Sequence, residues 1–226
     1  MLEVVTSRNA HQYQDALHDM FDMRHRIFVE RMGWEALRKP DRLEKDQFDN
    51  DDAIYLLLTD DDGRVIGSHR MLQTVKPHLF SDVFPQYCAV KGVQRGEKIL
   101  ELTRTCVDEE KLDKAAMERA RKRIMVGLFE FFVRAGYGYV TMLSPVDLVF
   151  RYLLIGIDVK PLGIPVEIDG IKQVALMAPI NAEALAKLRE AYGVAEPQVV
   201  YLGAPEGDPL RLAPTEMPQP GLEAAE

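Results

Sequence analysis

The sequence is poor in features that define several large classes of protein. Its 226 residues contain two cysteines. The spacing of Cys88 and Cys106 fits neither a disulfide framework nor a cysteine zinc motif, so we expect two reduced thiols. No apolar run approaches the roughly 20 residues that a membrane-spanning helix needs, and no basic start followed by an apolar stretch indicates a signal peptide. These absences together predict a cytoplasmic protein without a membrane partner.

Basic residues are also in deficit. Lysine and arginine total 28 against 36 aspartate and glutamate residues, which gives a net charge of −8. This balance argues against a nucleic-acid partner, because such proteins need positive charge at the phosphates. The chain has no Walker loop, dinucleotide-binding glycine fingerprint or nucleophile elbow. His11, His18 and His25 recur every seven residues without an acidic or cysteine partner at metal-ligand spacing, so no metal site is expected.

What the chain does have is the composition of an ordinary globular domain, with 47% hydrophobic residues. Residues 1–202 are long enough to bury a substantial core and are expected to form one domain. Residues 203–226 contain five prolines and few large apolar side chains. This composition predicts a disordered tail.

Hydrophobic periodicity predicts an alternation of strands and helices. The clearest helix covers residues 115–135, where apolar side chains recur at helical spacing up to Gly136. Further helices are expected over 11–26, 146–155 and 181–192, and strands over 2–6, 53–59, 64–73, 98–107, 139–143, 157–160 and 171–177. The Asp-Asp-Asp-Gly sequence at 60–63 predicts a hairpin turn. This order favours an α/β fold in which one sheet carries helices on both faces.

Residues 34–52 form a long connection without a periodic pattern. A structureless loop of this length is usually functional or disordered. It begins at Trp34, the single tryptophan, and contains Asp46 and Asp49 near its end. The two aspartates are either part of a solvated cluster or a pair of acceptors for an arginine or a cationic ligand. The aromatic and acidic content favours a loop that closes over a ligand.

Two strands contain charges at positions where apolar residues are expected. Arg70 lies in an apolar strand, and a buried guanidinium is costly unless it is paired, so we expect it to bind one of the loop aspartates. Glu101 and Arg104 share the next strand along the chain. Simple alternation sends their side chains to opposite faces. Both can serve one cleft only if a bulge near Thr103 re-aims one of them.

Arg24 and Phe28 are four residues apart and therefore point the same way on a helix. An arginine beside an aromatic ring suits a ligand that carries both a carboxylate and a cation. A surface arginine above a core phenylalanine gives the same spacing. The basic run over 119–123 is either a solvated helix face or a docking surface for an acidic carrier protein or for coenzyme A phosphates.

Taken together, these residues resemble the pattern of the acyl-homoserine-lactone synthases, the LuxI-type family of bacterial quorum-sensing autoinducer synthases. The order and spacing of that pattern are matched by Arg24, Phe28, Trp34, Asp46, Asp49, Arg70, Phe84, Glu101 and Arg104. The resemblance covers about residues 1–180. Each position alone is a weak signal, but nine positions in order are specific.

The resemblance implies a GNAT-like three-layer α/β/α sandwich whose mixed central sheet is splayed. It also implies that S-adenosylmethionine is a substrate, so that no cofactor is needed, and that acyl-CoA or acyl carrier protein supplies the acyl group. The α-amine attacks the thioester, and the carboxylate then displaces the sulfonium to give the lactone and methylthioadenosine. Segments 34–41, 46–49 and 83–86 are most similar to a subset that uses branched or aryl acyl-CoA.

The family pattern further implies roles for single residues. Glu101 is expected to be the catalytic base, Thr141 to line the acyl pocket, and the ion pairs of Asp46, Asp49 and Arg70 to order the loop. The expected S-adenosylmethionine site comprises Arg24, Phe28, Trp34, Asp46, Phe84 and Arg104.

One segment departs from the usual GNAT pattern. The glycine-rich loop whose backbone N–H groups bind pyrophosphate is missing after Val107, where residues 108–110 are Asp-Glu-Glu. The carrier of the acyl group therefore stays open. Two alternative functions are an ordinary GNAT N-acetyltransferase acting on an amine, and a non-catalytic sensor that binds S-adenosylmethionine.

Overall fold

The computed structural model describes residues 1–201, and the tail expected over 203–226 lies outside these described residues. The strands form one mixed sheet in the order β6-β8-β5-β4-β3-β2-β1-β9, with β7 paired to β8. They are β1 (Leu2–Val5), β2 (Ile54–Thr59), β3 (Val65–Gln73), β4 (Ile99–Val107), β5 (Tyr139–Pro145), β6 (Lys160–Pro161), β7 (Val166–Ile168), β8 (Ile171–Pro179) and β9 (Val199–Val200). The α-helices are α1 (Gln14–Arg24), α2 (Leu79–Asp82), α3 (Lys114–Ala135), α4 (Val146–Ile155) and α5 (Ala182–Tyr192).

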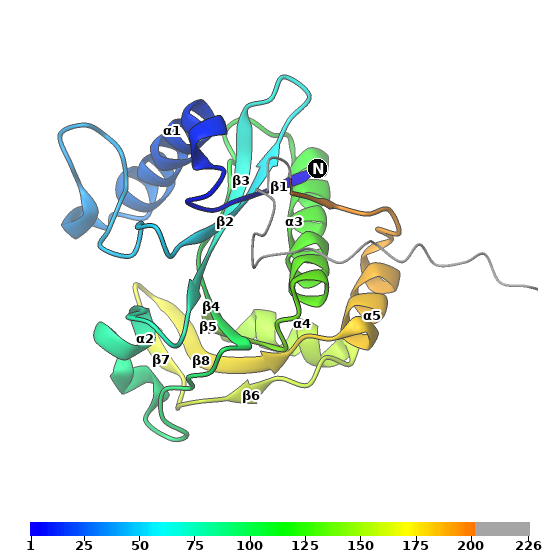
Figure 1. Cartoon of the computed structure of the whole chain (residues 1–226). Helices are drawn as coiled ribbons and strands as arrows, with labels where there is room; N and C mark the ends of the chain where they lie inside the picture. Colours follow the sequence, from blue (N-terminus) through cyan, green and yellow to red (C-terminus); the bar gives the residue numbers. More distant parts are fainter. Residues whose placement is uncertain (202–226) are drawn as a thin grey trace, which may run out of the picture.

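The sheet is covered by helices on both faces. Figure 1 shows α1 and α2 on one face and α3, α4 and α5 on the other. Successive residues of a strand point to opposite faces, so Met71 of β3 lies in the core beneath α3, while its neighbour Leu72 lies in the core beneath α1. These two cores confirm the predicted three-layer α/β/α sandwich. We call the side that carries α1 and α2 the α1 face.

The sheet splays open between β4 and β5. These two strands are parallel and pair only over three positions, from Ile99 with Tyr139 to Glu101 with Thr141. Beyond Glu101, β4 continues to Val107 and β5 to Pro145 without pairing to each other. The strands therefore separate beyond Glu101, as expected for a splayed GNAT-like sheet.

Local sequence signals set the ends of α3 and α5, two of the helices on the opposite side of the sheet, which we call the α3 face. Asp113 caps α3 by accepting a hydrogen bond from the backbone N–H of Ala116 at 2.7 Å, and Asn181 caps α5 by accepting one from Ala184 at 2.8 Å. The predicted Gly136 stop is also confirmed, because Gly136 takes the left-handed conformation with φ 78° that ends α3.

The structure corrects several expected boundaries. Helix α1 begins at Gln14 rather than residue 11, because residues 10–12 form a separate 3₁₀ turn. After Arg24 the helix widens into a π-helical segment, His25–Arg31, and periodicity at 3.6 residues per turn cannot indicate this widening. The strand expected over 157–160 is wrong in position, since β6 begins at Lys160.

Several short elements were not expected at all. Helix α2 and strands β7 and β9 are two to four residues long, which is too short for a periodic pattern to develop. The loop expected over 34–52 is confirmed apart from one 3₁₀ turn, Glu35–Leu37. No helix within residues 1–201 is long and apolar enough to cross a membrane.

Candidate active site

A bulge in β4 places two charged side chains on the same face of the sheet. Arg70 of β3 pairs with Thr103 of β4, whereas Ser68 pairs with Cys106, so β4 carries one extra residue between these positions. Arg104 lies in the bulge with φ 49°, a left-handed conformation that costs a non-glycine residue about 1–2 kcal/mol. The bulge predicted near Thr103 is therefore confirmed.

The consequence is a break in the alternation of β4. Glu101 and Thr103 point to the α1 face because they pair with Leu72 and Arg70 of that face. Arg104 follows Thr103 directly and still reaches loop carboxylates on this face. The opposite charges at 101 and 104 thus share one side of the sheet.

Three arginines and three carboxylates form a closed ring of alternating charges on the α1 face. The contacts run from Arg24 to Glu44 (2.5 Å), Arg104 (3.1 Å), Asp46 (2.7 Å), Arg70 (2.6 Å), Asp49 (2.8 Å) and back to Arg24 (2.8 Å). Each group has two oppositely charged neighbours, and formal charges cancel. The carboxylates lie close enough together to attract a cation, but three guanidinium groups already neutralise them.

The charge ring is buried, and each charge depends on its neighbours. Arg24, Arg70, Glu44 and Asp49 have fully buried side chains. Burial alone would raise the pKa of Asp49, but hydrogen bonds from Arg24 and the charges of Arg24 and Arg70 lower it overall. Burial alone would lower the pKa of Arg24, but its bonds and charge contacts with Asp49 and Glu44 raise it. Asp49 and Arg24 are therefore both charged at neutral pH.

The ring connects three parts of the chain. Arg24 ends α1, Arg70 and Arg104 come from β3 and β4, and all three carboxylates come from the loop before β2. The expected pairing of Arg70 with the loop is confirmed, because it bonds both oxygens of Asp46, at 2.6 and 3.0 Å. The loop is thus fixed to the sheet by buried ion pairs.

Two aromatic rings cover the outer part of the charge ring. Phe28 and Trp34 stack with centroids 5.0 Å apart and an interplanar angle of 12°. The guanidinium carbon of Arg104 lies 5.7 Å from each of these ring centroids. This separation is within the range of cation–π attraction. Arg104 is therefore held between loop carboxylates and aromatic faces, and with Asp46 it is one of the two ring members that retain some exposure, at 9% each.

Glu101 lies beside the charge ring and is buried. Its carboxylate accepts hydrogen bonds from the backbone N–H groups of Leu79 and Phe80, at 2.8 and 2.9 Å. Burial raises the pKa of Glu101 to about 7, although these hydrogen bonds and the charge of Arg70 oppose the shift. A carboxylate with a pKa near the working pH suits general base catalysis.

Apolar side chains continue from Glu101 toward β8. Thr141 is the register partner of Glu101 and Met177, and its buried Oγ1 has no hydrogen-bond partner within residues 1–201. Phe84 packs against both the α1-face core and a smaller apolar cluster under α2. That smaller cluster comprises Phe80, Cys88, Leu162 and Ala175, with Phe84, Tyr87, Val93, Leu143 and Met177 packed against it. We call it the β8 cluster.

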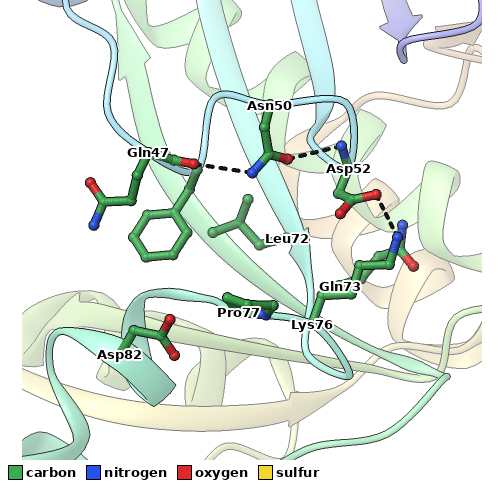
Figure 2. A pocket seen from close by; sticks show the side chains of 9 residues that line it. Gln47, Asn50, Asp52, Leu72, Gln73, Lys76, Pro77 and Asp82 are labelled. Atoms are coloured by element: carbon green, nitrogen blue, oxygen red, sulfur yellow. Dashed lines mark hydrogen bonds and ion pairs between the residues drawn. The ribbon is translucent and has the colours of Figure 1, made fainter.

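An open cavity of about 330 Å³ lies between the acidic loop and α2. Leu72, which pairs with Glu101, lines it together with Phe48 and Asp82. Figure 2 shows Asn50 bridging the backbone of residues 47 and 52 on one side, and Asp52 bonding Lys76 on the other. The cavity is therefore lined by sequence neighbours of Asp46 and Asp49 and by the strand partner of Glu101, but not by the charge ring or Glu101 themselves.

The structure gathers the sequence-predicted residues but adds one that was missed. Arg24, Asp46, Asp49, Arg70 and Arg104 meet in the charge ring, next to Phe28 and Trp34. Thr141 pairs with Glu101, and Phe84 packs against the apolar core of the α1 face. Glu44 was not expected, although it bonds both Arg24 and Arg104. The sequence offers a weak signal for it, an acidic residue two positions before Asp46 on the same loop.

The segments considered for carrier binding are tied to the protein itself. Asp108 is buried and pairs with Arg26 at 2.8 Å. In the basic run, Arg121 bonds Glu109 and Arg123 bonds Gln198. These contacts favour the solvated-face interpretation of residues 119–123.

A splayed α/β/α sandwich with a buried carboxylate where two strands separate belongs to the GNAT-like class of fold that the sequence predicts. Comparison with known proteins narrows this class. A family model described as autoinducer synthase matches residues 8–188. The chain is 32% identical to the isovaleryl-homoserine lactone synthase of Bradyrhizobium diazoefficiens over 213 residues, 94% of each chain.

Solved structures agree with this result. The CoA-dependent acyl-homoserine lactone synthase BjaI, with S-adenosylmethionine and isopentyl-CoA, has a TM-score of 0.83 and 32% identity, over 93% of this chain and 96% of BjaI. MesI, also described as CoA-dependent, has a TM-score of 0.79 and 28% identity, over 88% and 99% of the two chains. The chain therefore belongs to the autoinducer synthase family. It is an acyltransferase that makes an acyl-homoserine lactone from small-molecule substrates.

Proposed function

We propose that this enzyme transfers a short branched acyl group from coenzyme A to the α-amine of S-adenosylmethionine and then closes the lactone ring. The observation that supports this assignment is the meeting of Glu101, the charge ring and the stacked aromatic pair on one face, at the point where the sheet opens. S-adenosylmethionine carries an ammonium, a carboxylate and a sulfonium. Groups of both charge signs beside flat rings suit such a ligand.

Acylation begins with a proton transfer. The ammonium of S-adenosylmethionine must lose a proton before its nitrogen can attack, and Glu101 is the proposed acceptor, directly or through a water. The free amine then attacks the thioester carbonyl, and the amide forms as the C–S bond to coenzyme A breaks. As the amide forms, the nitrogen loses a second proton, which leaves with the thiolate as the coenzyme A thiol. The first proton stays on Glu101 and is then released to water. A pKa of about 7 at Glu101 allows the carboxylate to accept and release this proton near neutral pH.

Ring closure requires the carboxylate of the bound amino acid to be held in place. One carboxylate oxygen attacks the carbon next to the sulfonium, so a C–O bond forms and the C–S bond breaks, releasing neutral methylthioadenosine. Arg104 is the proposed partner of this carboxylate, because it retains some exposure and faces Phe28 and Trp34. Arg24 is fully buried between Glu44 and Asp49. Its proposed role is therefore to hold the loop in position.

The acyl group is proposed to enter the opening between β4 and β5. Beyond Thr141, this opening leads to the β8 cluster, in which Leu143 and Met177 come from the face that also carries Thr141. Apolar side chains of this kind suit a short hydrocarbon chain. The relatives support coenzyme A as the carrier and a branched chain, because BjaI was solved with isopentyl-CoA and both BjaI and MesI are described as CoA-dependent.

One experiment tests this proposal. Purified enzyme is incubated with S-adenosylmethionine and a panel of acyl-CoA and acyl-carrier-protein thioesters, and the lactone and methylthioadenosine are measured by mass. We expect isovaleryl-CoA to give the highest kcat/KM, with one methylthioadenosine per lactone. The same rate is expected after chelation with EDTA, since neither a metal nor a cofactor is proposed.

Other outcomes would contradict the proposal in different ways. Faster turnover of acyl-carrier-protein thioesters would reject coenzyme A as the carrier. Acetylation of simple amines without methylthioadenosine release would favour an ordinary N-acetyltransferase. Binding of S-adenosylmethionine without turnover of any thioester would favour a sensor.

A further inference from the structure

A buried histidine occupies the position opposite the β4 bulge. In the register of β3 and β4, Ser68 pairs with Cys106 and Arg70 with Thr103. The one residue between them on β3 is His69, which therefore faces two residues, Arg104 and Thr105. A bulge of this kind has fewer ladder hydrogen bonds to fix it than a regular strand. An interaction other than the ladder hydrogen bonds is therefore needed to hold Arg104 in its left-handed conformation.

The imidazole of His69 is fixed at both nitrogens. Nε2 lies 3.2 Å from the carbonyl oxygen of Ile124 in α3, and Nδ1 lies 2.9 Å from Oγ1 of Thr105 in the bulge. A carbonyl only accepts, so Nε2 carries the proton and Nδ1 accepts from the threonine hydroxyl. His69 is fully buried, and burial lowers its pKa to about 4. It is therefore a neutral brace at the pH at which the enzyme works.

His69 and its hydrogen bonds connect the two sides of the sheet. His69 and Thr105 point toward α3, whereas Arg70 and Arg104 point toward the α1 face. Thr105 immediately follows Arg104, so anchoring its side chain to α3 limits the rotation of the backbone at Arg104. The guanidinium is then left between Glu44, Asp46 and the stacked aromatic pair.

We propose that His69 is a positioning residue for Arg104, acting through its hydrogen bond with Thr105 to fix the bulge that aims the guanidinium into the S-adenosylmethionine site. This inference rests on the proposed role of Arg104 in binding the carboxylate of that substrate. His69 itself touches neither substrate nor reacting atoms. Its contribution is the orientation of one charge on the opposite face.

Steady-state kinetics of four variants test the proposal. His69→Leu removes both hydrogen bonds and is expected to raise the KM for S-adenosylmethionine about 10- to 100-fold, the cost of losing a well-directed charged hydrogen bond. The KM for isovaleryl-CoA is expected to change less than about twofold, well below that cost. His69→Gln keeps a donor and an acceptor and should restore most of the loss. Thr105→Val should reproduce the direction of the effect, and the His69→Leu/Thr105→Val double variant should be no worse than His69→Leu alone.

Met71→Val is the matched control. Met71 is the next residue of β3 that faces α3, but it lies outside the bulge. Met71→Val should lower the melting temperature about as much as His69→Leu does, without changing the KM for S-adenosylmethionine. If His69→Leu does not fold, His69→Gln and Thr105→Val carry the test, because Thr105 is exposed and each of these two changes leaves the size of the side chain nearly unchanged.

The results separate this inference from the proposed function. An unchanged KM for S-adenosylmethionine in folded His69→Leu, or an equal increase in Met71→Val, would overturn the role of His69. If Arg104→Gln raises that KM in the same assay, the proposed function stands regardless. Nitrogen-15 NMR of the histidine ring gives a readout that does not depend on activity. A proton found on Nδ1 would contradict the hydrogen-bond arrangement, and a proton on Nε2 at pH 7 would support it.

Discussion

Glu101 and Thr141 face each other across β4 and β5 at the last paired position before the two strands separate. The pairing places the proposed base at the fork of the sheet, with the charge ring to one side and the β8 cluster to the other. An amine held by the ring and a thioester in the opening would meet at this point. In the proposed mechanism, acyl transfer therefore takes place at this fork.

Replacing the carboxylate of Glu101 tests its role as a base. Glu101→Gln is expected to lower kcat about 10²- to 10⁴-fold, the usual range for loss of a general base. S-adenosylmethionine binding, measured by calorimetry, should be mostly kept because the charge ring is intact. The exposed Glu97→Gln is a matched control on the same segment. Turnover of Glu101→Gln at the wild-type rate would remove Glu101 from the mechanism.

The pH dependence of activity follows from the raised pKa of Glu101. Because only the carboxylate form accepts a proton, kcat/KM should rise with pH through about 7. The residual activity of Glu101→Gln should lack this limb. A rise centred near pH 4.5, the ordinary value for this carboxyl, would contradict the buried environment described above.

The raised pKa of Glu101 also affects stability, but here the expected change with pH is a decrease. The folded protein keeps the proton of Glu101 up to about pH 7, whereas the unfolded chain loses it near the ordinary value of a glutamate. The folded state thus binds more protons between these two values, and the contribution of Glu101 to the free energy of unfolding falls as pH rises through this interval. Urea titrations at several pH values measure this slope. A contribution that increases with pH over this interval would be inconsistent with a raised pKa.

Breaking the charge ring should release the acidic loop. Asp46→Asn or Arg70→Ala takes one of its two charged partners from each of two ring members, and removing one member of a buried ion pair typically costs about 3–5 kcal/mol. We expect faster hydrogen exchange over residues 34–52 and weaker binding of both substrates. Arg38→Ala removes the exposed ion pair with Glu35 on the same loop and should have little effect. Exchange over 34–52 that stays as slow in Asp46→Asn as in the wild type would refute the loop-ordering role.

The β8 cluster should set acyl chain length. Leu143→Ala would create space beyond Thr141, and each additional buried methylene is worth about 0.8 kcal/mol. The ratio of kcat/KM for hexanoyl-CoA to that for isovaleryl-CoA should therefore rise several-fold. Met142→Ala is the control, because Met142 is the neighbour that points to the α3 face. A similar ratio change in both variants would place the acyl chain elsewhere.

Much of the site could be predicted from the sequence because the energetic rules are local. A guanidinium in an apolar strand requires a partner, which led from Arg70 to the loop aspartates. Opposite charges three residues apart on one strand required a bulge, which the structure shows at Arg104. The stop of α3 at Gly136 could be predicted in the same way, whereas its cap at Asp113 was not expected.

Other features depend on contacts that a single sequence does not reveal. Glu44 is a lone acidic residue in a loop until the fold brings Arg24 and Arg104 to it. His69 appears as a polar residue in an apolar strand until the bulge opposite it is known. The π-helical segment, His25–Arg31, and the short helix α2, which supplies two donors to Glu101, also arise from tertiary packing.

The closed alternation of the charge ring has a consequence for how this enzyme can diverge. Each member of the ring contacts two members of opposite sign, so losing one side chain leaves two buried ions with one partner each instead of two. A substitution at one ring position is then tolerated only when the neighbouring positions change as well. During evolution, substitutions at the six positions of the charge ring should therefore occur together. Residues of the β8 cluster, which are proposed to set the acyl preference, should change one at a time.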